Sequence, residues 1–450
     1  MESPEELTEK LREFCASGSR DQLLARGLAR GMIWDEGTPP DGGPNFSPTL
    51  TNDLLNHGYM VLGCAVRLRS LSLQQQIPDT DVLDSAFLTA AECIEAVVRR
   101  GERRNDRGFH LTVAAAAFHL AHYGARSFSL IAENTQQLNL TSIELVLVCL
   151  MQRRLDELER LCLSWLSDGR FTDDGIATSL ESEEQDVDAA GAAYLAVCRV
   201  FHQAIANFEF AIRTGLSQFA VNAIEMLHSC VDAAEQLKHV PLWWICVLAR
   251  HLVDDLWGRS LHELLPVDPE NGDDWNRLRQ DFIELLSQRN IAEIDLWPSQ
   301  ISAAMRVIDE SDSLVVALPT SSGKTRIAEL CILKCLAAGR RVIYVTPLRA
   351  LSAQVEQTLG RSFKPLGFSV TSVYGASGIG ASDVDTMKSA NIVVATPEKL
   401  DFAIRQDAEV IDDVGLIVLD EGHMIGLSER EIRYEPALFT KNLLNKETIA

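Results

Sequence analysis

The pattern of hydrophobic and polar positions divides this chain into two parts. From residue 1 to about 290, apolar residues recur at the spacing of amphipathic helices. After that point, short continuous apolar runs alternate with helical segments, a pattern typical of parallel strands covered on both faces. The sequence therefore predicts an all-α helical array over residues 1–290, followed by an α/β domain with a mainly parallel sheet over residues 291–450.

The helical part is expected to contain a series of helices separated by polar breaks. Two of them begin at capping boxes, Ser3–Glu6 and Thr141–Glu144, whose hydroxyl and carboxylate groups satisfy free amides of the first turn. The acidic stretch 167–188 predicts an exposed linker or flexible loop. The expected helices span residues 4–30, 53–73, 82–100, 109–123, 145–166, 189–213, 217–238, 241–257 and 274–289.

The α/β part is expected to place its strands on apolar runs. An open α/β sheet binds ligands at the carboxyl ends of its strands. Polar residues directly after these runs are therefore the candidates for chemistry. The expected strands span residues 314–318, 342–345, 370–373, 392–395 and 416–419.

The residues after the first run form a candidate phosphate-binding loop. Pro319–Thr325 is a polar turn before a predicted helix, and its backbone amides would face one concavity at the helix N-terminus. Lys324 can reach the β- and γ-phosphates of a nucleotide, and the Thr325 hydroxyl suits Mg²⁺. The match is imperfect, because Leu318 stands where the general pattern has glycine.

A second motif follows the last apolar run. Asp420 and Glu421 stand directly after the hydrophobic residues 416–419. Two carboxylates at a strand end can hold Mg²⁺ and polarise a water molecule beside a phosphate loop. The pair of motifs therefore predicts the hydrolysis of a nucleoside triphosphate.

Together the motifs resemble those of superfamily-two helicases of the DExH-box kind, and most of all the superkiller-type (Ski-like) branch. The resemblance covers residues from about 294 to 441 and implies the first of two RecA-like lobes. It implies that Asp420 holds Mg²⁺, that Glu421 orients or deprotonates the attacking water, and that His423 senses the γ-phosphate. It also implies ATP as the nucleotide, bound by Thr320, Ser321, Ser322, Gly323, Lys324 and Thr325.

Gln300 resembles the adenine-reading glutamine of the same helicases. It ends the segment Leu296–Gln300, upstream of the phosphate loop. A glutamine amide offers one donor and one acceptor, which fit the N6/N7 edge of adenine. The alternative is that this segment is only a helix cap, with Ser299 ahead of the helix.

Two further segments follow the runs 342–345 and 392–395 and resemble the strand-contact motifs of the family. Each combines a small polar group, a proline turn and a predicted helix N-terminus, which bind phosphates rather than bases. They imply a single strand of DNA or RNA as a partner, without choosing between the two. The alternative is that Thr-Pro after a strand is simply a good helix start. The candidate contacts are Pro347, Arg349, Thr396, Pro397 and Lys399.

The charge of the chain argues against general polyanion binding. The formal net charge is −23, of which the helical part carries −18 and the α/β part −5. We therefore expect the helical part to dock a protein partner or further lobes of the same protein. Its densest basic group is either a solvated helix end or a phosphate contact, and comprises Arg99, Arg100, Arg103, Arg104 and Arg107.

The ten cysteines lie mostly within apolar helical patterns, without any Cys-x-x-Cys pair. Cys331 and Cys335 are expected to be buried thiols rather than metal ligands. This usage indicates a reducing compartment. Because the sequence shows neither a signal peptide nor an uncharged apolar run long enough to span a bilayer, we expect a cytoplasmic protein without membrane contact.

These observations predict an ATP-dependent helicase or translocase that couples Mg-ATP hydrolysis to movement on a strand. The alternative is an ATP-gated protein-docking switch without unwinding activity. In the family, a second RecA-like lobe completes the ATP site, and the sequence up to Ala450 does not contain one. We therefore expect a fragment of a longer protein that hydrolyses ATP weakly; the alternative is a relative that has lost its motor half. Relatives of this branch serve repair, RNA turnover or phage defence, and the motifs are common to all three.

Overall fold

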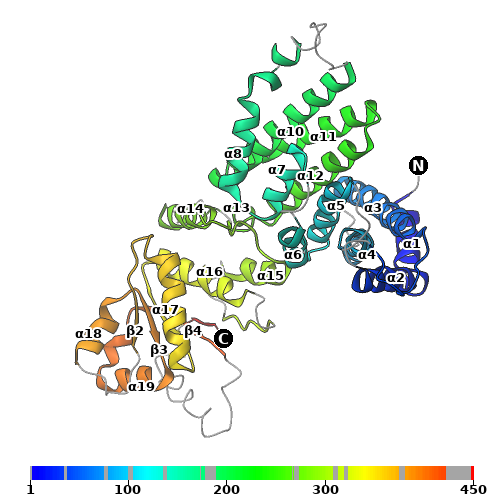
Figure 1. Cartoon of the computed structure of the whole chain (residues 1–450). Coiled ribbons are helices and arrows are strands. Elements are labelled where there is room, and N and C mark those ends of the chain that lie inside the picture. The colour runs from blue at the N-terminus through cyan, green and yellow to red at the C-terminus, as the bar shows by residue number, and fades with distance from the viewer. Residues whose placement is uncertain are drawn as a thin grey trace. The chain divides into compact units, whose positions relative to one another are not determined.

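The structure is a computed structural model of the 450-residue chain (Figure 1). It describes residues 3–34, 38–75, 80–99, 105–134, 139–172, 174–177, 189–265, 267, 273–307, 313–318, 323–373, 381–421 and 447–449.

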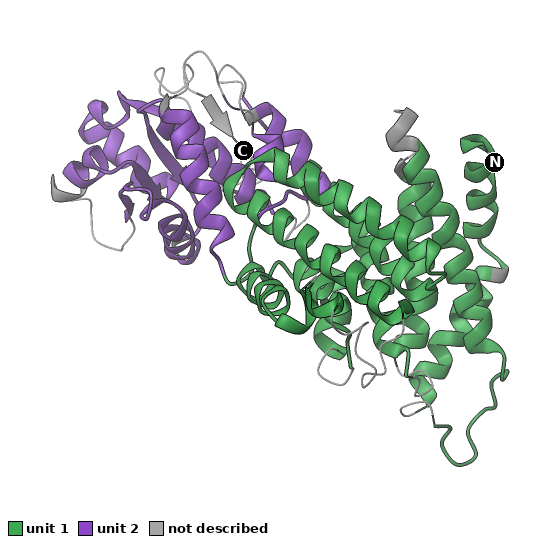
Figure 2. Ribbon diagram, turned by 90° about the horizontal axis from the view of Figure 1, so that it is seen from above, with its two compact units in different colours: residues 1–258, 290–293 green, residues 259–289, 294–450 purple. Residues whose placement is uncertain are grey.

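The chain forms two compact units, shown in different colours in Figure 2. Unit 1 comprises residues 1–258 and 290–293, and unit 2 comprises residues 259–289 and 294–450. The division at residue 258 differs from the expected boundary at 290. The reason is that residues 259–289 bury Leu261, Trp275 and Phe282 in the core of the α/β unit.

Unit 1 is an array of helices in which neighbours in sequence pack against each other, most extensively α3 with α4 and α10 with α11. Its helices are α1 (Pro4–Cys15), α2 (Ser19–Ile33), α3 (Leu50–Gln75), α4 (Thr80–Val98), α5 (Arg107–Leu120), α6 (Gly124–Asn134), α7 (Ser142–Met151), α8 (Leu155–Leu166), α10 (Ala189–Thr214), α11 (Ser217–Gln236) and α12 (Val240–Gly258), with the short 3₁₀ helix η2 (Gly169–Phe171).

Both predicted capping boxes are present. The Ser3 hydroxyl accepts from the Glu6 amide, and the Thr141 hydroxyl accepts from the Glu144 amide, with each carboxylate bonded back to the cap amide. Two predicted helices were wrong, because each is two helices. Gly18 (φ 127°) separates α1 from α2, and Arg153 (φ 58°) separates α7 from α8. Neither backbone conformation can occur within a right-handed helix.

Helix α10 is long and apolar enough to cross a membrane by composition. Its buried side chains, which include Phe201, Ile205 and Phe208, lie within unit 1. The helix packs against α8, α11 and α7. Packing within a helical array therefore accounts for its apolar composition.

Unit 2 contains a parallel sheet in the order β2-β3-β1-β4-β5. Figure 1 labels its strands β2, β3 and β4. The predicted fold class, a helical array followed by an α/β domain with a mainly parallel sheet, is confirmed. The strands are β1 (Arg341–Val345), β2 (Val370–Val373), β3 (Ile392–Ala395), β4 (Val414–Leu419) and β5 (Glu447–Ile449). The helices are α13 (Leu261–Leu264), α14 (Asp273–Ser287), α15 (Pro298–Val307), α16 (Lys324–Ala337), α17 (Arg349–Phe363), α18 (Ala381–Ser389) and α19 (Pro397–Gln406), with η3 (Ala408–Ile411).

The strand predicted at 314–318 was wrong. Residues 313–318 belong to no strand among those that the structure describes, although Leu314 is buried and Val315 beside it is exposed. The alternate residues Leu314, Val316 and Leu318 contact the core of unit 2. Apolar alternation predicts an extended backbone, but a strand also needs a hydrogen-bonded neighbour, which the local pattern cannot specify.

The sheet is covered on both faces, as the continuous apolar runs predict. Along β1, Val342 and Tyr344 point into one core with residues of α14, α16 and α17. Ile343 and Val345 point into the other core, with residues of α18, α19 and η3. The alternation of a strand thus assigns Tyr344 to the face that α16 covers.

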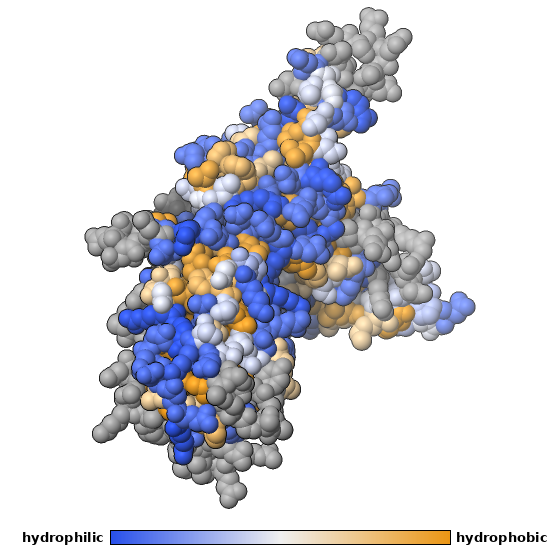
Figure 3. Space-filling view, turned by 90° about the vertical axis from the view of Figure 1, so that its left-hand side faces the viewer, coloured by the Kyte–Doolittle hydropathy of each residue, from blue (hydrophilic) through white to orange (hydrophobic). Residues whose placement is uncertain are grey.

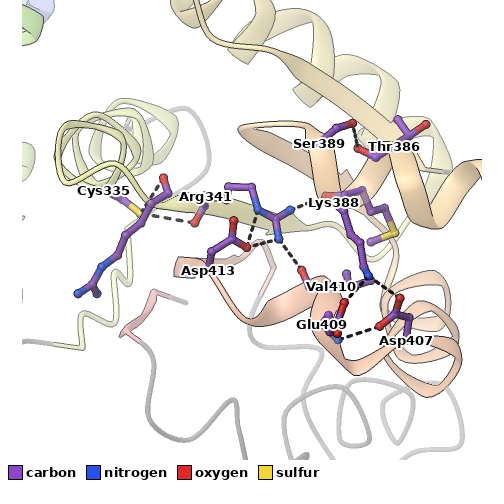
Figure 4. Close-up of polar contacts among 11 residues, drawn as sticks. Cys335, Arg341, Thr386, Lys388, Ser389, Asp407, Glu409, Val410 and Asp413 are labelled. Atoms are coloured by element: carbon purple, nitrogen blue, oxygen red, sulfur yellow. Dashed lines mark hydrogen bonds and ion pairs between the residues drawn. The ribbon is translucent and has the colours of Figure 1, made fainter.

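Arg341 fastens the amino ends of the strands (Figure 4). It is 7% exposed, and its guanidinium donates to the Asp413 carboxylate and to the carbonyls of Met387 and Val410. Close by, Lys388 pairs with Asp407 and Glu409. These contacts join β1, β4, α18 and η3. The polar side chains at this edge therefore stabilise the sheet.

The surface mixes residue types. On the face drawn in Figure 3, hydrophilic residues are interspersed with smaller hydrophobic areas. Met32 (81% exposed) and Val315 (76%) are among the exposed large apolar side chains. Single apolar residues of this kind are normal on a protein surface and by themselves mark no site.

Candidate nucleotide and nucleic-acid site

The carboxyl ends of three adjacent strands meet at one edge of the sheet. Val345 of β1 lies in register with Ala395 of β3 and with Leu419 of β4. Beyond the register, the Thr346 amide donates to the Ala395 carbonyl (3.0 Å) and the Asp420 amide donates to the Val345 carbonyl (2.9 Å). The motifs that follow these three strands are therefore neighbours in space, at the edge where α/β sheets bind ligands.

Gly323 and Lys324 mark the start of α16. Gly323 is the N-cap, with a left-handed backbone (φ 80°), and Lys324 is the first helical residue. The helix is 14 residues long and opens without a side-chain cap. Its first amides and its dipole favour an anion here. Thr325 is exposed on the first turn.

Gln300 lies against this helix start. Its Nε2 donates to the Gly323 carbonyl (2.9 Å), and its Oε1 accepts from the Trp297 amide (2.8 Å). The side chain is 5% exposed, whereas Trp297 is 50% exposed. Gln300 is thus joined to the start of the candidate phosphate loop helix, and two of its hydrogen bonds are made within the protein. The sequence predicted this glutamine as an adenine contact or as part of a helix cap, but not its bond to the Gly323 carbonyl.

Asp420 and Glu421 stand where β4 ends. Burial and the Glu421 charge raise the pKa of Asp420, while the Glu421 amide, the Lys324 ammonium and the Tyr344 hydroxyl lower it. The Lys324 charge is therefore close enough to act on Asp420, across a sequence separation that only the fold can close. Glu421 has a left-handed backbone (φ 54°), a strained conformation that clusters at functional sites.

Tyr344 lies beside the candidate site and was not among the predicted site residues. It is 4% exposed on β1, and its hydroxyl hydrogen-bonds to Asp420. Burial and then the Asp420 charge raise the pKa of Tyr344, and the charges of Glu329 and Glu421 act in the same direction. The phenol therefore keeps its proton and donates a hydrogen bond to the carboxylate. The signal in the sequence that could have pointed to Tyr344 is its hydroxyl, a polar group within an otherwise apolar strand.

The two strand-contact motifs lie side by side. Pro347 is half-buried, Pro397 is the buried first residue of α19, and Lys399 is half-buried on the same helix. The Thr396 side chain is 4% exposed. The hydroxyls of Thr346 and Ser352 are 2.6 Å apart and stabilise the turn between β1 and α17. These positions present turn backbone and two helix N-termini at one edge, a combination that can bind phosphates.

Several predicted site residues cannot be placed. Thr320, Ser321, Ser322 and His423 lie outside the described residues. Arg349 begins α17, and its side chain also lies outside what the structure describes.

The basic group of the helical unit is partly engaged. Arg99 pairs with Glu95 and Glu133, and Arg107 donates to the Val98 carbonyl at the end of α4. These contacts favour the interpretation as a helix end. Arg100, Arg103 and Arg104 lie outside the described residues.

The donor set fits Mg²⁺ bound together with a nucleotide. Asp420 supplies a carboxylate and Thr325 a hydroxyl, both hard oxygen ligands. Among the described residues no group of three or more His, Cys, Asp or Glu side chains could hold a metal ion. This is compatible with Mg²⁺, which usually takes one or two carboxylates plus substrate phosphates rather than an all-protein cage.

Comparison with known proteins finds relatives of the α/β part. Residues 297–444 match the DEAD/DEAH box helicase family. The chain is 36% identical over 148 residues to ATP-dependent DNA helicase Hel308 of Pyrococcus abyssi, covering 33% of this chain and 20% of the relative. It is 34% identical over 170 residues to a probable ATP-dependent helicase of Methanocaldococcus jannaschii, covering 37% and 20%.

A third relative is similar along most of the chain. Hachiman protein HamB of Bacillus cereus is 24% identical over 418 residues, which is 92% of this chain and 35% of the relative. The chain thus spans only 20% to 35% of the length of these relatives. Residues 297–444 are thus similar to DEAD/DEAH box helicase domains.

Proposed function

We propose that this chain is part of an ATP-dependent nucleic-acid helicase or translocase, and that Lys324, Thr325, Asp420 and Glu421 form its Mg-ATP site. One observation carries the proposal: the Lys324 charge at the start of α16 acts on Asp420 at the end of β4. A cation at a helix N-terminus beside a strand-end carboxylate pair is the arrangement that phosphoryl transfer needs.

The proposed roles follow from position. Lys324 and the first amides of α16 neutralise the phosphates, Asp420 and Thr325 would hold Mg²⁺, and Glu421 orients or deprotonates the attacking water. Bound Mg²⁺ would supply charge neutralisation between the phosphate oxygens. Tyr344 holds the Asp420 carboxylate in place through its hydrogen bond.

The test is equilibrium binding of a fluorescent ATP analogue in Mg²⁺. Lys324→Ala should weaken binding at least about tenfold and abolish any hydrolysis, because it removes the only side-chain charge proposed for the phosphates. Glu421→Gln should retain binding and stop hydrolysis. Unchanged hydrolysis in the Lys324→Ala protein would contradict the proposal.

The proposed nucleic-acid partner is a single strand that lies along the edge formed by residues 346–349 and 396–399. The support is that these two motifs are brought together by the bond between the Thr346 amide and the Ala395 carbonyl. Such a site grips phosphates and sugars rather than bases. Competition between matched single strands of DNA and RNA decides which of them is the substrate.

For the helical unit we propose docking of a protein or of further lobes of the same protein. Residues 1–290, which hold nearly all of this unit, carry −18 of the net charge of −23, a field that repels a polyanion. Reversal of the five arginines from Arg99 to Arg107 to Glu should leave nucleic-acid affinity nearly unchanged. A sharp fall in both affinity and salt dependence would make the group a strand contact instead.

The alternative is an ATP-gated docking switch that does not move on a strand. The acidic helical unit favours it, because its charge suits a protein partner better than a nucleic acid. ATP-dependent strand separation would exclude this function. ATP-gated capture of a protein, without strand separation, would favour it.

A reducing, cytoplasmic location suits either function and agrees with ten cysteines that form no disulfide.

A further inference from the structure

Gln300 joins the beginnings of two helices, α15 and α16. Helix α15 begins at Pro298, so Gln300 is its third residue. The Trp297 carbonyl accepts from the Ile301 amide (3.2 Å), which makes Trp297 the cap residue that precedes the helix. The amide of Trp297 in turn donates to Gln300 Oε1 (2.8 Å). A third-position glutamine that accepts from the cap amide is half of a capping box, so this oxygen stabilises the start of α15.

The nitrogen of the same side chain contacts the start of α16. Gln300 Nε2 donates to the Gly323 carbonyl (2.9 Å), which also accepts from the Arg326 amide (3.0 Å) in the first turn of the helix. Both lone pairs of this carbonyl oxygen therefore have donors. The approach is close, because a Cβ added at Gly323 would lie 1.9 Å from Gln300 Nε2. Glycine at this position thus permits the hydrogen bond.

These two bonds engage both polar atoms of Gln300, whose side chain is 5% exposed. To read adenine, a glutamine must present its oxygen to the N6 amino group and its nitrogen to N7 of the same base. In Gln300 the two atoms instead contact backbone groups at the starts of different helices. Turning toward a base would break both bonds and leave the Trp297 amide and the Gly323 carbonyl without this partner, which costs free energy.

We propose that Gln300 is a positioning residue of the nucleotide site, which holds the start of α16 against the start of α15, and that it does not read the base. The inference rests on the proposed function and names its substrate class: nucleoside triphosphates irrespective of their purine base. Recognition then depends on the triphosphate, through the Lys324 charge and the first amides of α16.

The experiment measures the affinities of the whole chain for two purine nucleotides. A fluorescent ATP analogue in Mg²⁺ is displaced by the β,γ-imido analogue of ATP or of GTP, at a temperature where every variant is folded. The wild type should bind the two imido analogues with affinities that differ by less than about fivefold. A bidentate contact to adenine would favour the ATP analogue by about fivefold or more. A preference of at least this size overturns the inference.

Gln300→Met tests the positioning role, because methionine has a similar length and no N–H donor. It should lower both affinities by the same factor, about threefold to tenfold, the size of one lost hydrogen bond. Ser299→Ala is the matched control, since Ser299 is exposed in the same turn of α15; it should change neither affinity. A loss confined to the ATP analogue indicates a base-reading glutamine, and a lower melting temperature with unchanged affinities indicates a purely structural one. Either result overturns the inference.

Gln300→Glu is the second variant, and it keeps the test usable if Gln300→Met does not fold. Glutamate can still accept from the Trp297 amide, as in a capping box, but its carboxylate cannot donate to the Gly323 carbonyl. The added charge repels either triphosphate equally, so the ratio of the two affinities is the readout. This ratio should stay as in the wild type, and a changed ratio contradicts the inference.

Failure of the proposed function has a different outcome. If the wild type binds neither imido analogue, or if Lys324→Ala binds them as well as the wild type does, then the proposed nucleotide site itself is wrong. A wild type that binds the ATP analogue at least fivefold better than the GTP analogue overturns only the inference about Gln300.

Discussion

The two units use buried charge in different ways. In the helical unit, Asp255 of α12 is almost buried, with Arg69 Nη2 at 3.2 Å and His122 Nε2 at 3.7 Å from its Oδ1. In the α/β unit, Asp420 has another carboxylate, Glu421, as its neighbour, and its pKa is raised. Matched charge stabilises a fold, whereas a crowded carboxylate pair becomes favourable only when a ligand supplies the missing cation.

The same contrast exists within the α/β unit, between the two ends of its sheet. At the amino ends, Arg341 makes all its contacts with protein groups. At the carboxyl ends, the start of α16 and the residues after β4 bring opposite charges close together around a helix N-terminus that no side chain caps. The edge at the amino ends of the strands stabilises the sheet, and the edge at the carboxyl ends is available for a ligand.

The largest effect is expected at the fastening edge. Arg341→Ala should lower the free energy of unfolding by about 3 kcal/mol, because it leaves buried carbonyls without their donor and breaks a partly buried ion pair. Chemical denaturation measures the loss. Arg340→Ala is the matched control, since Arg340 is exposed and adjacent; it should cost less than about 0.5 kcal/mol. Similar losses of stability in the two variants would show that the buried contacts of Arg341 do not hold the amino ends of the strands together.

The second prediction concerns the matched charge of the helical unit. The carboxylates of Asp255 and Asp84, which face the two ring nitrogens of His122, raise the pKa of His122 to about 9, against desolvation. Since the folded pKa lies above the unfolded value, this stability is fully present below about pH 6.5 and is lost as the pH rises through about 9. Because solvent screens this partly exposed ring, the loss should be no more than about 2 kcal/mol.

Urea denaturation of the whole chain between pH 6 and 9.5 tests this. His122→Asn is the comparison, because asparagine tolerates the left-handed backbone (φ 65°) and does not titrate. The difference in stability between wild type and variant should shrink as the pH rises. A difference that stays constant would mean that the network does not depend on a charged His122.

The third prediction separates backbone strain from contact at the start of α16. Gly323 and Gly339 both have left-handed backbones, with φ of 80° and 70°. A Cβ added at Gly323 would lie 1.9 Å from Gln300 Nε2, whereas at Gly339 it would meet nothing within 4 Å. Gly339→Ala should therefore cost about 1 kcal/mol from strain alone, and Gly323→Ala about 2 kcal/mol.

Nucleotide binding sharpens the comparison. Gly323→Ala should also weaken binding of the ATP analogue, because Gln300 must leave the Gly323 carbonyl, and Gly339→Ala should not. Adding Gln300→Ala to Gly323→Ala should relieve part of the stability loss. Equal effects of the two glycine variants would show that the Gln300 contact is unimportant.

The sequence predicted those parts of the fold that depend on local periodicity. Four strands, the parallel sheet and both capping boxes follow from spacing and composition. It failed where one residue reverses the backbone, as at Gly18 and Arg153, because helical spacing continues across such a break. It also failed at 314–318, where strand formation depends on a distant partner.

The site shows the same limit. Lys324, Asp420 and Glu421 are candidates because they belong to known motifs that follow apolar runs. Tyr344 was not a candidate, since it lies inside an apolar run. Its place beside Asp420 follows from strand register, which brings together residues far apart in sequence. Motifs predict which groups meet a ligand, and the structure is needed to find the groups that pack against them.

The smallest expected effect compares two threonine N-caps, one in each unit. The Thr141 hydroxyl accepts from the Glu144 amide of α7, whereas Thr396, before α19, makes no side-chain cap hydrogen bond. Thr141→Ala should therefore lower the free energy of unfolding by about 1 kcal/mol, as for other lost caps, and leave strand binding unchanged. Thr396→Ala should cost less stability but weaken the binding of a single-stranded oligonucleotide severalfold, because Thr396 stands at the proposed phosphate-binding edge. Denaturation and fluorescence anisotropy measure the two effects on the same preparations. If Thr396→Ala costs as much stability as Thr141→Ala and leaves binding intact, then Thr396 only starts a helix. In that case the polar groups of the nucleic-acid edge stabilise the fold, as those of the helical unit do, and the difference between the two units does not extend to this edge.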